Sequence, residues 1–355
     1  MKLIPNIDTL EFTLNYRDYN KIIGSLYPML DPARDDSQQN KVNSKIELNG
    51  QSFELLGHGN AFYYFLLHND NMEIRFVREH DVMNDHYPIY CKLKSVYLWQ
   101  YGYEKAYTLA LDYLTNIFGL LLDTKISRLD LAIHCNQHID IDMQQGVVCR
   151  AKHNNVWSDS AAITGYQIGK SPIMLRIYNK GKEITASSGK TWFYGIWQSA
   201  GFDLSDEVWN VEFQLRREFF KERGLSSVDD AFTALPILYQ YLTRDWVRVV
   251  NDDNPVPSRR STARWWQQVQ TALTDVVYTN TLDKQQMLRT NSEHLLKSAM
   301  GYLVSIAAIE NLTTPEDLLE YLRHALVMRY VDDEHKKSSF PDVVQERRAV
   351  LCLSH

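Results

Sequence analysis

The sequence predicts an α+β fold: a largely antiparallel sheet with flanking helices, followed by a helical carboxyl-terminal region. Two observations support this prediction. Segments with the two-residue alternation of strands fill the first hundred residues and return from residue 125, with one helix-length segment between them. From residue 226 onward, helical spacing dominates instead. We therefore expect two regions, an α+β domain over residues 1–225 and a helical region over residues 226–355.

The expected elements follow in chain order. Strands are predicted at residues 9–16, 51–57, 61–68, 72–79, 125–133, 173–178 and 207–215. Apolar residues at helical spacing predict helices at residues 103–122, 228–249, 265–277, 282–312 and 314–330. The last of these helices has Thr314 as its cap and Pro315 at its first position. The polar run at residues 31–43 is expected to be an exposed loop, and residues 255–264 a linker.

Composition narrows the class of protein. Hydrophobic residues make up 45% of the 355-residue chain and charged residues 23%, which predicts a soluble protein with a large core. No apolar run reaches the length of about 18 residues that a membrane helix needs. The first residues are too polar for a signal peptide, so we expect a cytoplasmic protein with no membrane partner. The four cysteines form no CxxC pair, which indicates free thiols.

Residues 175–183, LRIYNKGKE, place a tyrosine between two cations in a predicted strand. Arg176 and Lys180 lie two residues on either side of Tyr178, so all three side chains are expected on one face of the sheet. Two positive charges beside a phenol would favour the phenolate and bind phosphate. This setting suits attack on a phosphodiester, with a phosphotyrosine as the intermediate. The alternative is a half-buried tyrosine with exposed basic neighbours.

Acidic residues in the flanking predicted strands are candidates for a metal site. Asp130 lies among apolar residues, where an aspartate is uncommon and costly to bury unpaired. The alternative for Asp130 is an ion pair with Arg128, for which we expect poor geometry. Glu212 has a similar setting, and the alternative there is an ion pair with Arg176 or Arg216 across the sheet.

Asp8 is the third candidate ligand, at the opening of the first expected strand. The alternative for Asp8 is an ordinary turn aspartate. Carboxylate oxygens are ligands that suit Mg²⁺ or Mn²⁺ rather than zinc. A divalent cation held by such a set would polarise the phosphate that the tyrosine attacks.

Basic residues gather in two places, although the net charge of −6 argues against a protein that coats nucleic acid nonspecifically. One set surrounds Tyr178, and the other precedes the helix expected at residues 265–277 and adjoins two tryptophans. Such residues hold phosphates and stack on bases; the alternative for the tryptophans is packing of that helix. The predicted DNA contacts are Lys170, Lys182, Arg259, Arg260, Arg264 and Trp265.

Three motifs together resemble the replication initiation factor family: RLD at residues 128–130, RIYNKGKE at residues 176–183 and NVEFQLR at residues 210–216. This family comprises rolling-circle initiators of small plasmids and filamentous-type phages, and related relaxases of integrative elements. The likeness extends through residue 266. It implies metal-dependent nicking of one origin strand by Tyr178, a 5′-phosphotyrosine intermediate and later closure of the displaced strand. The metal ligands would be Asp130, Glu212 and Asp8.

The resemblance also implies partners. These are origin DNA, both duplex and single-stranded, and a host helicase and polymerase that act on the nicked origin. The helical region would bind DNA or mediate oligomerisation, and a homodimer is one open assembly state. Two alternatives remain open: a conjugative or mobilisation relaxase with the same chemistry, and a DNA-binding regulator that keeps the fold without catalysis.

Overall fold

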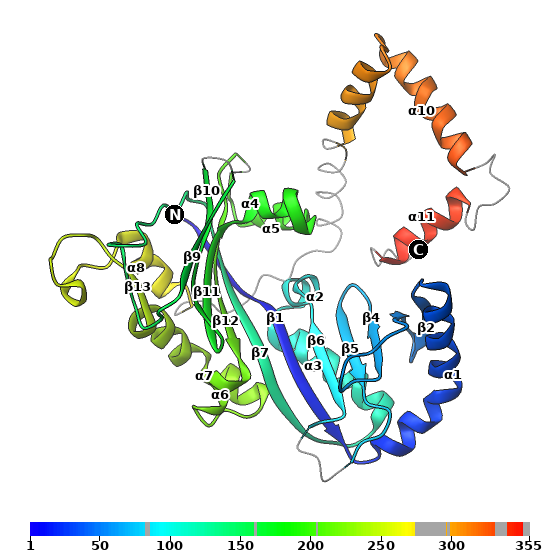
Figure 1. Cartoon of the computed structure of the whole chain (residues 1–355), viewed down its shortest axis with the longest axis horizontal. Helices are drawn as coiled ribbons and strands as arrows, with labels where there is room; N and C mark the ends of the chain where they lie inside the picture. The colour runs from blue at the N-terminus through cyan, green and yellow to red at the C-terminus, as the bar shows by residue number, and fades with distance from the viewer. Residues whose placement is uncertain are drawn as a thin grey trace. The chain divides into compact units, whose positions relative to one another are not determined.

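The computed structural model describes residues 1–81, 86–159, 162–203, 205–273, 296, 299–330 and 339–350. Contacts within the chain divide it into two compact units, Met1–Lys284 and Gln285–His355. The first unit contains a large sheet with helices packed on it (Figure 1). The second unit is helical in its described residues.

The sheet of the first unit is antiparallel throughout its described strands. They are β1 (Leu3–Tyr16), β2 (Ser44–Leu48), β3 (Gln51–Leu55), β4 (Phe65–His68), β5 (Met72–Phe76), β6 (Ile89–Leu93), β7 (Leu121–Cys135), β9 (Asn154–Asp159), β10 (Ala162–Lys170), β11 (Ile173–Asn179) and β12 (Trp209–Arg216). Their order in space is β2-β3-β4-β5-β6-β1-β7-β12-β11-β10-β9. The two longest strands, β1 and β7, pair along almost their whole length and join the two halves of the sheet.

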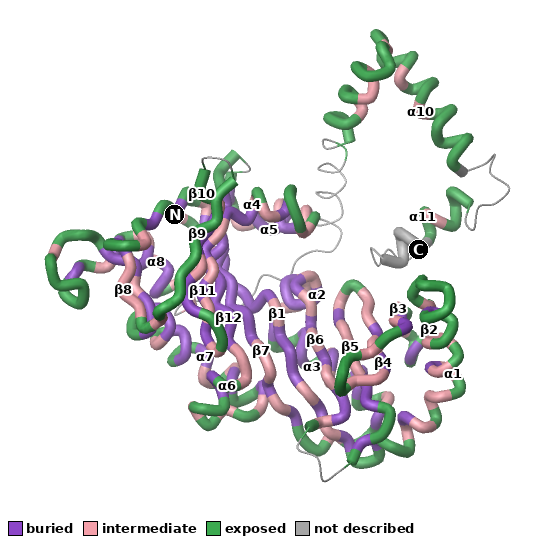
Figure 2. Tube along the Cα trace, in the orientation of Figure 1, coloured by how far each residue is buried: buried purple, intermediate pink, exposed green. Residues whose placement is uncertain are grey.

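Helices cover the sheet. They are α1 (Tyr19–Asn40), α2 (Ser95–Tyr101), α3 (Tyr103–Phe118), α4 (Lys180–Glu183), α5 (Phe193–Ser199), α6 (Arg217–Lys221), α7 (Val228–Gln240) and α8 (Arg264–Thr271), with the π-helices η1 (Ile184–Ser188) and η2 (Tyr241–Trp246) and the 3₁₀ helix η3 (Pro257–Arg259). Buried residues of α1, α3, α7 and α8 join the inward side chains of the sheet in one main core (Figure 2). A smaller core on the opposite face joins Ile4 to residues of α2, η1 and α5. The predicted α+β class with a largely antiparallel sheet is confirmed.

The loop expected at residues 31–43 is wrong in most of its length, because α1 continues to Asn40. Ile23 and Leu30 on one side of α1 are completely buried in the main core. The polar residues of the run lie mainly on the other, solvent-facing side of this helix. Packing of the apolar side therefore outweighs the two prolines within the helix, Pro28 and Pro32.

The carboxyl-terminal part of the first unit also differs from expectation. The helix expected at residues 228–249 is α-helical to Gln240 and π-helical (η2) to Trp246. The chain then forms β13 (Val247–Val249), which pairs with β8 (Val147–Cys149). The first compact unit extends to Lys284, and buried side chains of α7, β13 and α8 join its main core. Tertiary packing thus places these helices with the sheet.

In the second unit, α10 (Pro315–Tyr330) begins as predicted. The backbone N–H of Asp317 donates to Oγ1 of Thr314 at 3.2 Å, and the two side chains bond at 2.6 Å, so Thr314 caps the helix. A further helix, α11 (Phe340–Val350), follows. Of the helix expected at residues 282–312, residues 299–309 are helical, while residues 282–295 lie outside the described residues.

Candidate active site

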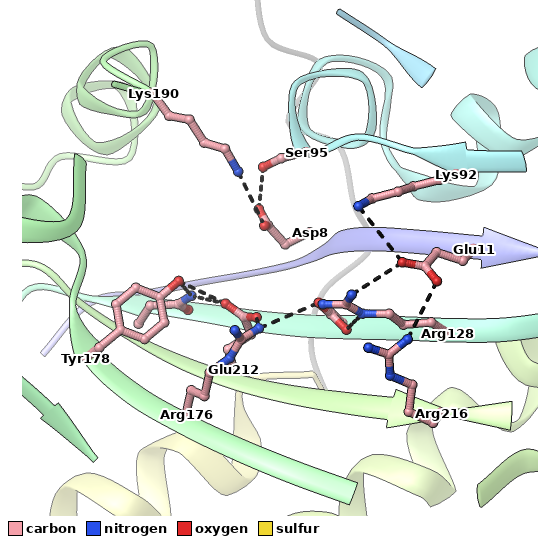
Figure 3. Close-up of polar contacts among 12 residues, drawn as sticks. Asp8, Glu11, Lys92, Ser95, Arg128, Arg176, Tyr178, Lys190, Glu212 and Arg216 are labelled. Carbon is pink, nitrogen blue, oxygen red and sulfur yellow. Dashed lines mark hydrogen bonds and ion pairs between the residues drawn. The ribbon is translucent and has the colours of Figure 1, made fainter. Parts of the chain in front are cut away.

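One face of the sheet packs on the main core, and the other carries charged side chains. Side chains alternate along a strand; in β7, Leu129 and Leu131 enter the core while Arg128 and Asp130 leave the opposite face. The same alternation in β1, β11 and β12 adds further residues to this polar face, which Figure 3 shows. The polar face comprises Glu11, Arg128, Asp130, Arg176, Tyr178, Glu212 and Arg216.

Tyr178 lies at the centre of a small hydrogen-bonded group. Its hydroxyl donates to Oε2 of Glu212 at 2.9 Å. Nδ2 of Asn210, the residue directly across from Tyr178 on β12, donates to the Tyr178 oxygen and to Oε2 of Glu212, both at 3.0 Å. The side chains of Asn210 and Glu212 are buried, whereas Tyr178 is half-buried. The phenol oxygen is therefore held next to a buried carboxylate.

Arg176 links two carboxylates of the polar face. It lies directly across from Glu212 in the sheet, and its Nη2 donates to Oε1 of Glu212. The same nitrogen lies 3.8 Å from Oδ2 of Asp130. Figure 3 shows Glu212 between Arg176 and Tyr178. One of the alternatives open from the sequence, pairing of Glu212 with Arg176, is thus what the structure shows.

Lys180 approaches the same phenol from the end of β11. Its side chain is buried, with Nζ 3.4 Å from the Tyr178 oxygen and 2.8 Å from Oε2 of Glu183. The neighbouring Asn179 points elsewhere and caps α4, because its Oδ1 accepts a hydrogen bond from the backbone N–H of Lys182 at 2.9 Å. Lys180 is therefore the cation in direct hydrogen-bond reach of Tyr178, as the spacing predicted.

The expectation that the two cations favour the phenolate is not met in this structure. Burial raises the pKa of Tyr178 well above its ordinary value, and the charges of Glu212 and Asp8 raise it further, against the opposing hydrogen bond from Asn210. Arg176 is itself paired with Glu212, and its Nη2 lies 3.8 Å from Oδ2 of Asp130. The resting tyrosine is therefore a protonated phenol whose proton points at Glu212.

Asp130 forms the ion pair with Arg128 that the sequence analysis expected to be geometrically poor. Nε of Arg128 donates to Oδ1 of Asp130 at 2.7 Å, and Nη2 donates to Oδ2. The expectation was wrong because residues two apart in a strand leave the same face and not opposite faces. Burial raises the pKa of Asp130, as does the nearby charge of Glu212, while the bond from Arg128 lowers it.

Glu11 is a buried carboxylate that the sequence analysis missed. Its Oε1 lies 3.3 Å from Nη1 of Arg128 and 4.0 Å from Nζ of Lys92, and its Oε2 lies 3.8 Å from Nη1 of Arg216. The signal was available, because Glu11 sits between Leu10 and a phenylalanine in the first expected strand, much as Asp130 sits between two leucines. Alternating acids and arginines therefore cross the polar face from β1 to β11 (Figure 3).

Asp8 contacts a different set of side chains. It lies at an irregularity of β1, between Ile7 and Thr9, rather than at a strand opening or in a turn. Its Oδ1 accepts hydrogen bonds from Oγ of Ser95 at 2.5 Å and Nε1 of Trp99 at 2.9 Å, and Lys190 lies 3.8 Å from Oδ2. Burial opposes ionisation, but the lysine charges and the Ser95 bond outweigh it and lower the pKa of Asp8 to about 2.

In this arrangement the predicted ligands Asp130, Glu212 and Asp8 do not form a metal site. Arginine and lysine already neutralise each carboxylate. Across the described residues, no three His, Cys, Asp or Glu side chains are grouped to hold an ion. Nδ1 of the buried His134 accepts a hydrogen bond from Nε1 of Trp197 at 2.9 Å. The neutral ring therefore carries its proton on Nε2, which leaves neither ring nitrogen free to bind a metal. Dependence on Mg²⁺ or Mn²⁺ stays a prediction.

The predicted DNA contacts have different surroundings. Arg260 is buried and bonds to Gln145 and Asn254, so it holds loops together and is not available to a phosphate. Trp265 is partly buried against the main core on α8. Four side chains are exposed, namely Lys170, Lys182, Arg259 and Arg264. Helix α8 packs on the core face, since Trp266 contacts Phe213 with ring centroids 6.4 Å apart, so the cluster around Arg264 lies across the sheet from Tyr178.

Comparisons with known proteins give a distant likeness. No protein-family model and no curated protein matches the sequence. Among solved structures, the chain is similar to a rolling circle replication initiator protein from Geobacillus stearothermophilus, with a TM-score of 0.43 and 15% sequence identity. The match covers 76% of this chain and 96% of that protein. No helix among the described residues is long and apolar enough to cross a membrane.

Proposed function

We propose that the chain nicks one strand of a replication origin, with Tyr178 as the nucleophile, and so starts rolling-circle replication. One observation carries the proposal: a phenol hydroxyl donates to a buried carboxylate at 2.9 Å, with a lysine ammonium 3.4 Å from its oxygen. A nucleophile beside a general base, in a positively charged setting, is the arrangement that covalent catalysis on a phosphodiester needs.

The proton of Tyr178 moves to Oε2 of Glu212 as the phenol oxygen attacks the phosphorus. The bond from phosphorus to the 3′ oxygen breaks, that oxygen takes a proton from water, and the 5′ phosphate stays on Tyr178. Lys180, whose Nζ is 3.4 Å from the Tyr178 oxygen, binds a non-bridging oxygen of this phosphate in the proposal. Arg176 and Asn210 act through Glu212, because they fix the orientation of its two oxygens. The free 3′-hydroxyl then primes synthesis.

Strand closure is the reverse of this step. A 3′-hydroxyl gives its proton to water and attacks the phosphotyrosine. A phosphodiester forms, and the phenol oxygen of Tyr178 leaves with the proton that Glu212 returns. The proposal includes a host helicase and a polymerase that act on the nicked origin in the cytoplasm, and a homodimer as an open assembly state. A relaxase would use the same residues, so only its target DNA separates it from an initiator.

A nicking assay on supercoiled plasmid carrying the native origin tests the proposal. We expect open circles with protein attached to the 5′ end, and mass spectrometry should place the nucleotide on Tyr178. Tyr178→Phe should abolish attachment without disturbing the fold, because Asn210 and Glu212 still bond to each other at 3.0 Å. Tyr194→Phe is the matched control and should cleave normally.

Two results would contradict the proposal. Open circles or covalent adducts formed by Tyr178→Phe would remove the nucleophile, and attachment at Tyr166 or Tyr194 would move it. Tight origin binding without cleavage by the wild-type protein, under any ionic condition, would favour the non-catalytic regulator.

A further inference from the structure

Trp157 differs from the other tryptophans of this chain. The chain has eight tryptophans, all within the described residues. Trp157 is the most exposed of them, with 37% of its surface accessible. It lies on β9, the edge strand of the sheet, whose six residues are all exposed (Figure 2). An exposed indole on a sheet edge is uncommon, because burial of a tryptophan normally stabilises the fold.

The sheet register places Trp157 in line with Tyr178. Tyr178 pairs with Gly165 on β10, and Gly165 pairs with Trp157 on β9. Residues directly across from one another leave the same face of a sheet, so Trp157 and Tyr178 share the polar face. Two strand spacings separate their backbones, roughly 10 Å. The indole therefore lies beside the phenol on the side away from Glu212.

Glycine at position 165 lets the two aromatic side chains lie close over its backbone. A Cβ atom at Gly165 would lie 2.8 Å from Cε3 of Trp157 and 2.8 Å from Cβ of Tyr178, closer than any side chain allows. The indole thus rests on the glycine backbone with one side and faces solvent with part of the other. A flat, apolar and partly open surface next to a nucleophile is a platform on which a base can stack.

We propose that Trp157 stacks on a base of single-stranded DNA next to the phosphate that Tyr178 attacks. The inference rests on the proposed nicking function, which it deepens by adding a residue that positions the strand. Charged groups near Tyr178 hold the phosphate, and stacking on Trp157 fixes the neighbouring nucleotide against the edge of the sheet. Stacking tolerates any base, so this contact adds affinity and register rather than sequence choice.

The simpler role is structural, since an aromatic side chain on a neighbouring strand can cover an exposed glycine. Trp157→Leu separates the two roles, because leucine still covers Gly165 but has no flat π surface. Trp157→Phe keeps a smaller π surface. Val156→Ala is the matched control, because Val156 is exposed on the same strand and points to the opposite face.

The test measures binding of a single-stranded origin oligonucleotide by proteins that carry Tyr178→Phe and cannot cleave. We expect Trp157→Ala and Trp157→Leu to weaken binding by about 5- to 100-fold, Trp157→Phe by much less, and Val156→Ala not at all. An abasic site at one position beside the scissile phosphate should weaken oligonucleotide binding by the protein that keeps Trp157. The same abasic site should not further weaken binding by Trp157→Leu.

Unchanged affinity in Trp157→Leu, with or without a loss of thermal stability, would overturn the stacking role and leave the nicking function intact. Equal sensitivity of both proteins to every abasic position would also overturn it. If the Tyr178→Phe protein binds no single-stranded origin DNA, the proposed function itself fails and the stacking role fails with it.

Discussion

Glu212 lies directly across from Arg176 and diagonally from Tyr178, so one buried carboxylate binds a guanidinium and a phenol at once. Oε1 faces the arginine, which leaves Oε2 for the proton of the tyrosine. Burial raises the pKa of the phenol that donates to Oε2. This relationship is the basis of the general-base role proposed for Glu212.

The general-base role predicts the effect of Glu212→Gln. Glutamine fills the same space and accepts a hydrogen bond but cannot take up the proton, so the rate of covalent attachment should fall by about 10²- to 10⁴-fold. Affinity for the origin oligonucleotide should change little. Single-turnover kinetics of adduct formation, with binding measured separately, checks both expectations.

Glu11→Gln is the control for Glu212→Gln. It also removes a buried carboxylate that pairs with arginine on the polar face, but the partners of Glu11 are Arg128 and Arg216 rather than Tyr178. Its attachment rate should stay close to that of the wild type. Equal losses in the two variants would mean that the charge network, and not proton transfer, limits the reaction.

The spacing of the motif predicted which side chains share the face of Tyr178, because alternation along a strand is a local property. Arg176 lies there, and Nζ of Lys180 reaches the Tyr178 oxygen. The partners could not be read from the chain, since they depend on strand register. Asn210 reaches Tyr178 only because β12 pairs with β11 at that position.

Register also explains the main error about chemistry. The sequence shows two cations beside Tyr178, but not that β12 brings Glu212 against Arg176 and β7 brings Asp130 close to it. The same holds for the fold: Leu30 is buried by the sheet that α1 covers, and no local pattern in a proline-containing polar run reports that contact.

The predicted metal dependence can be tested against this pairing. A divalent cation between Asp130 and Glu212 has to displace Arg176, so Arg176→Ala should bind Mn²⁺ more tightly than the wild type, by roughly tenfold or more. Calorimetric titration measures this without relying on activity. We further expect cleavage by the wild type to stop with chelator and to return with Mg²⁺ or Mn²⁺.

Arg216→Ala is the control for the metal experiment, because Arg216 pairs with Glu11 and not with the two predicted ligands. Its affinity for Mn²⁺ should equal that of the wild type. Cleavage that survives thorough chelation, together with no Mn²⁺ binding by Arg176→Ala, would remove the metal from the mechanism.

The arginines of the cluster around Arg264 should fall into two classes. Arg259 and Arg264 are exposed, so replacing both by alanine should weaken duplex-origin binding and reduce its dependence on salt, without changing stability. Arg260→Ala should instead lower the free energy of unfolding by about 1–3 kcal/mol, because its bonds to Gln145 and Asn254 are lost. Binding titrations at several salt concentrations and urea unfolding measure the two effects. Unchanged affinity and salt dependence in the double variant would restrict α8 to packing.

The final prediction concerns pH and the buried His134. Its ring stacks on Trp99 with centroids 4.9 Å apart, and Nδ1 accepts a bond from Trp197. Burial lowers the pKa of His134 to about 3, with a further contribution from the charge of Lys180. At pH values between this pKa and the ordinary histidine pKa of about 6.5, the His134 ring is protonated in the unfolded chain but not in the folded one. Stability contributed by the neutral ring is therefore complete above pH about 6.5 and falls as the pH decreases, by roughly 1.4 kcal/mol per pH unit at most.

His134→Gln removes this titration and keeps an acceptor for Trp197. We expect the free energy of unfolding in urea to fall between pH 6.5 and 4.5 by less in His134→Gln than in the wild type. The raised pKa of Asp130 has the opposite effect on the free energy of unfolding, because the folded state binds that proton more tightly. This effect is the same in both proteins and cancels when their pH profiles are compared. The lowered pKa of Asp8 matters only below this window. Parallel pH profiles for the two proteins would show that the folded chain accommodates a charged His134, and that the ring is not held neutral by its surroundings.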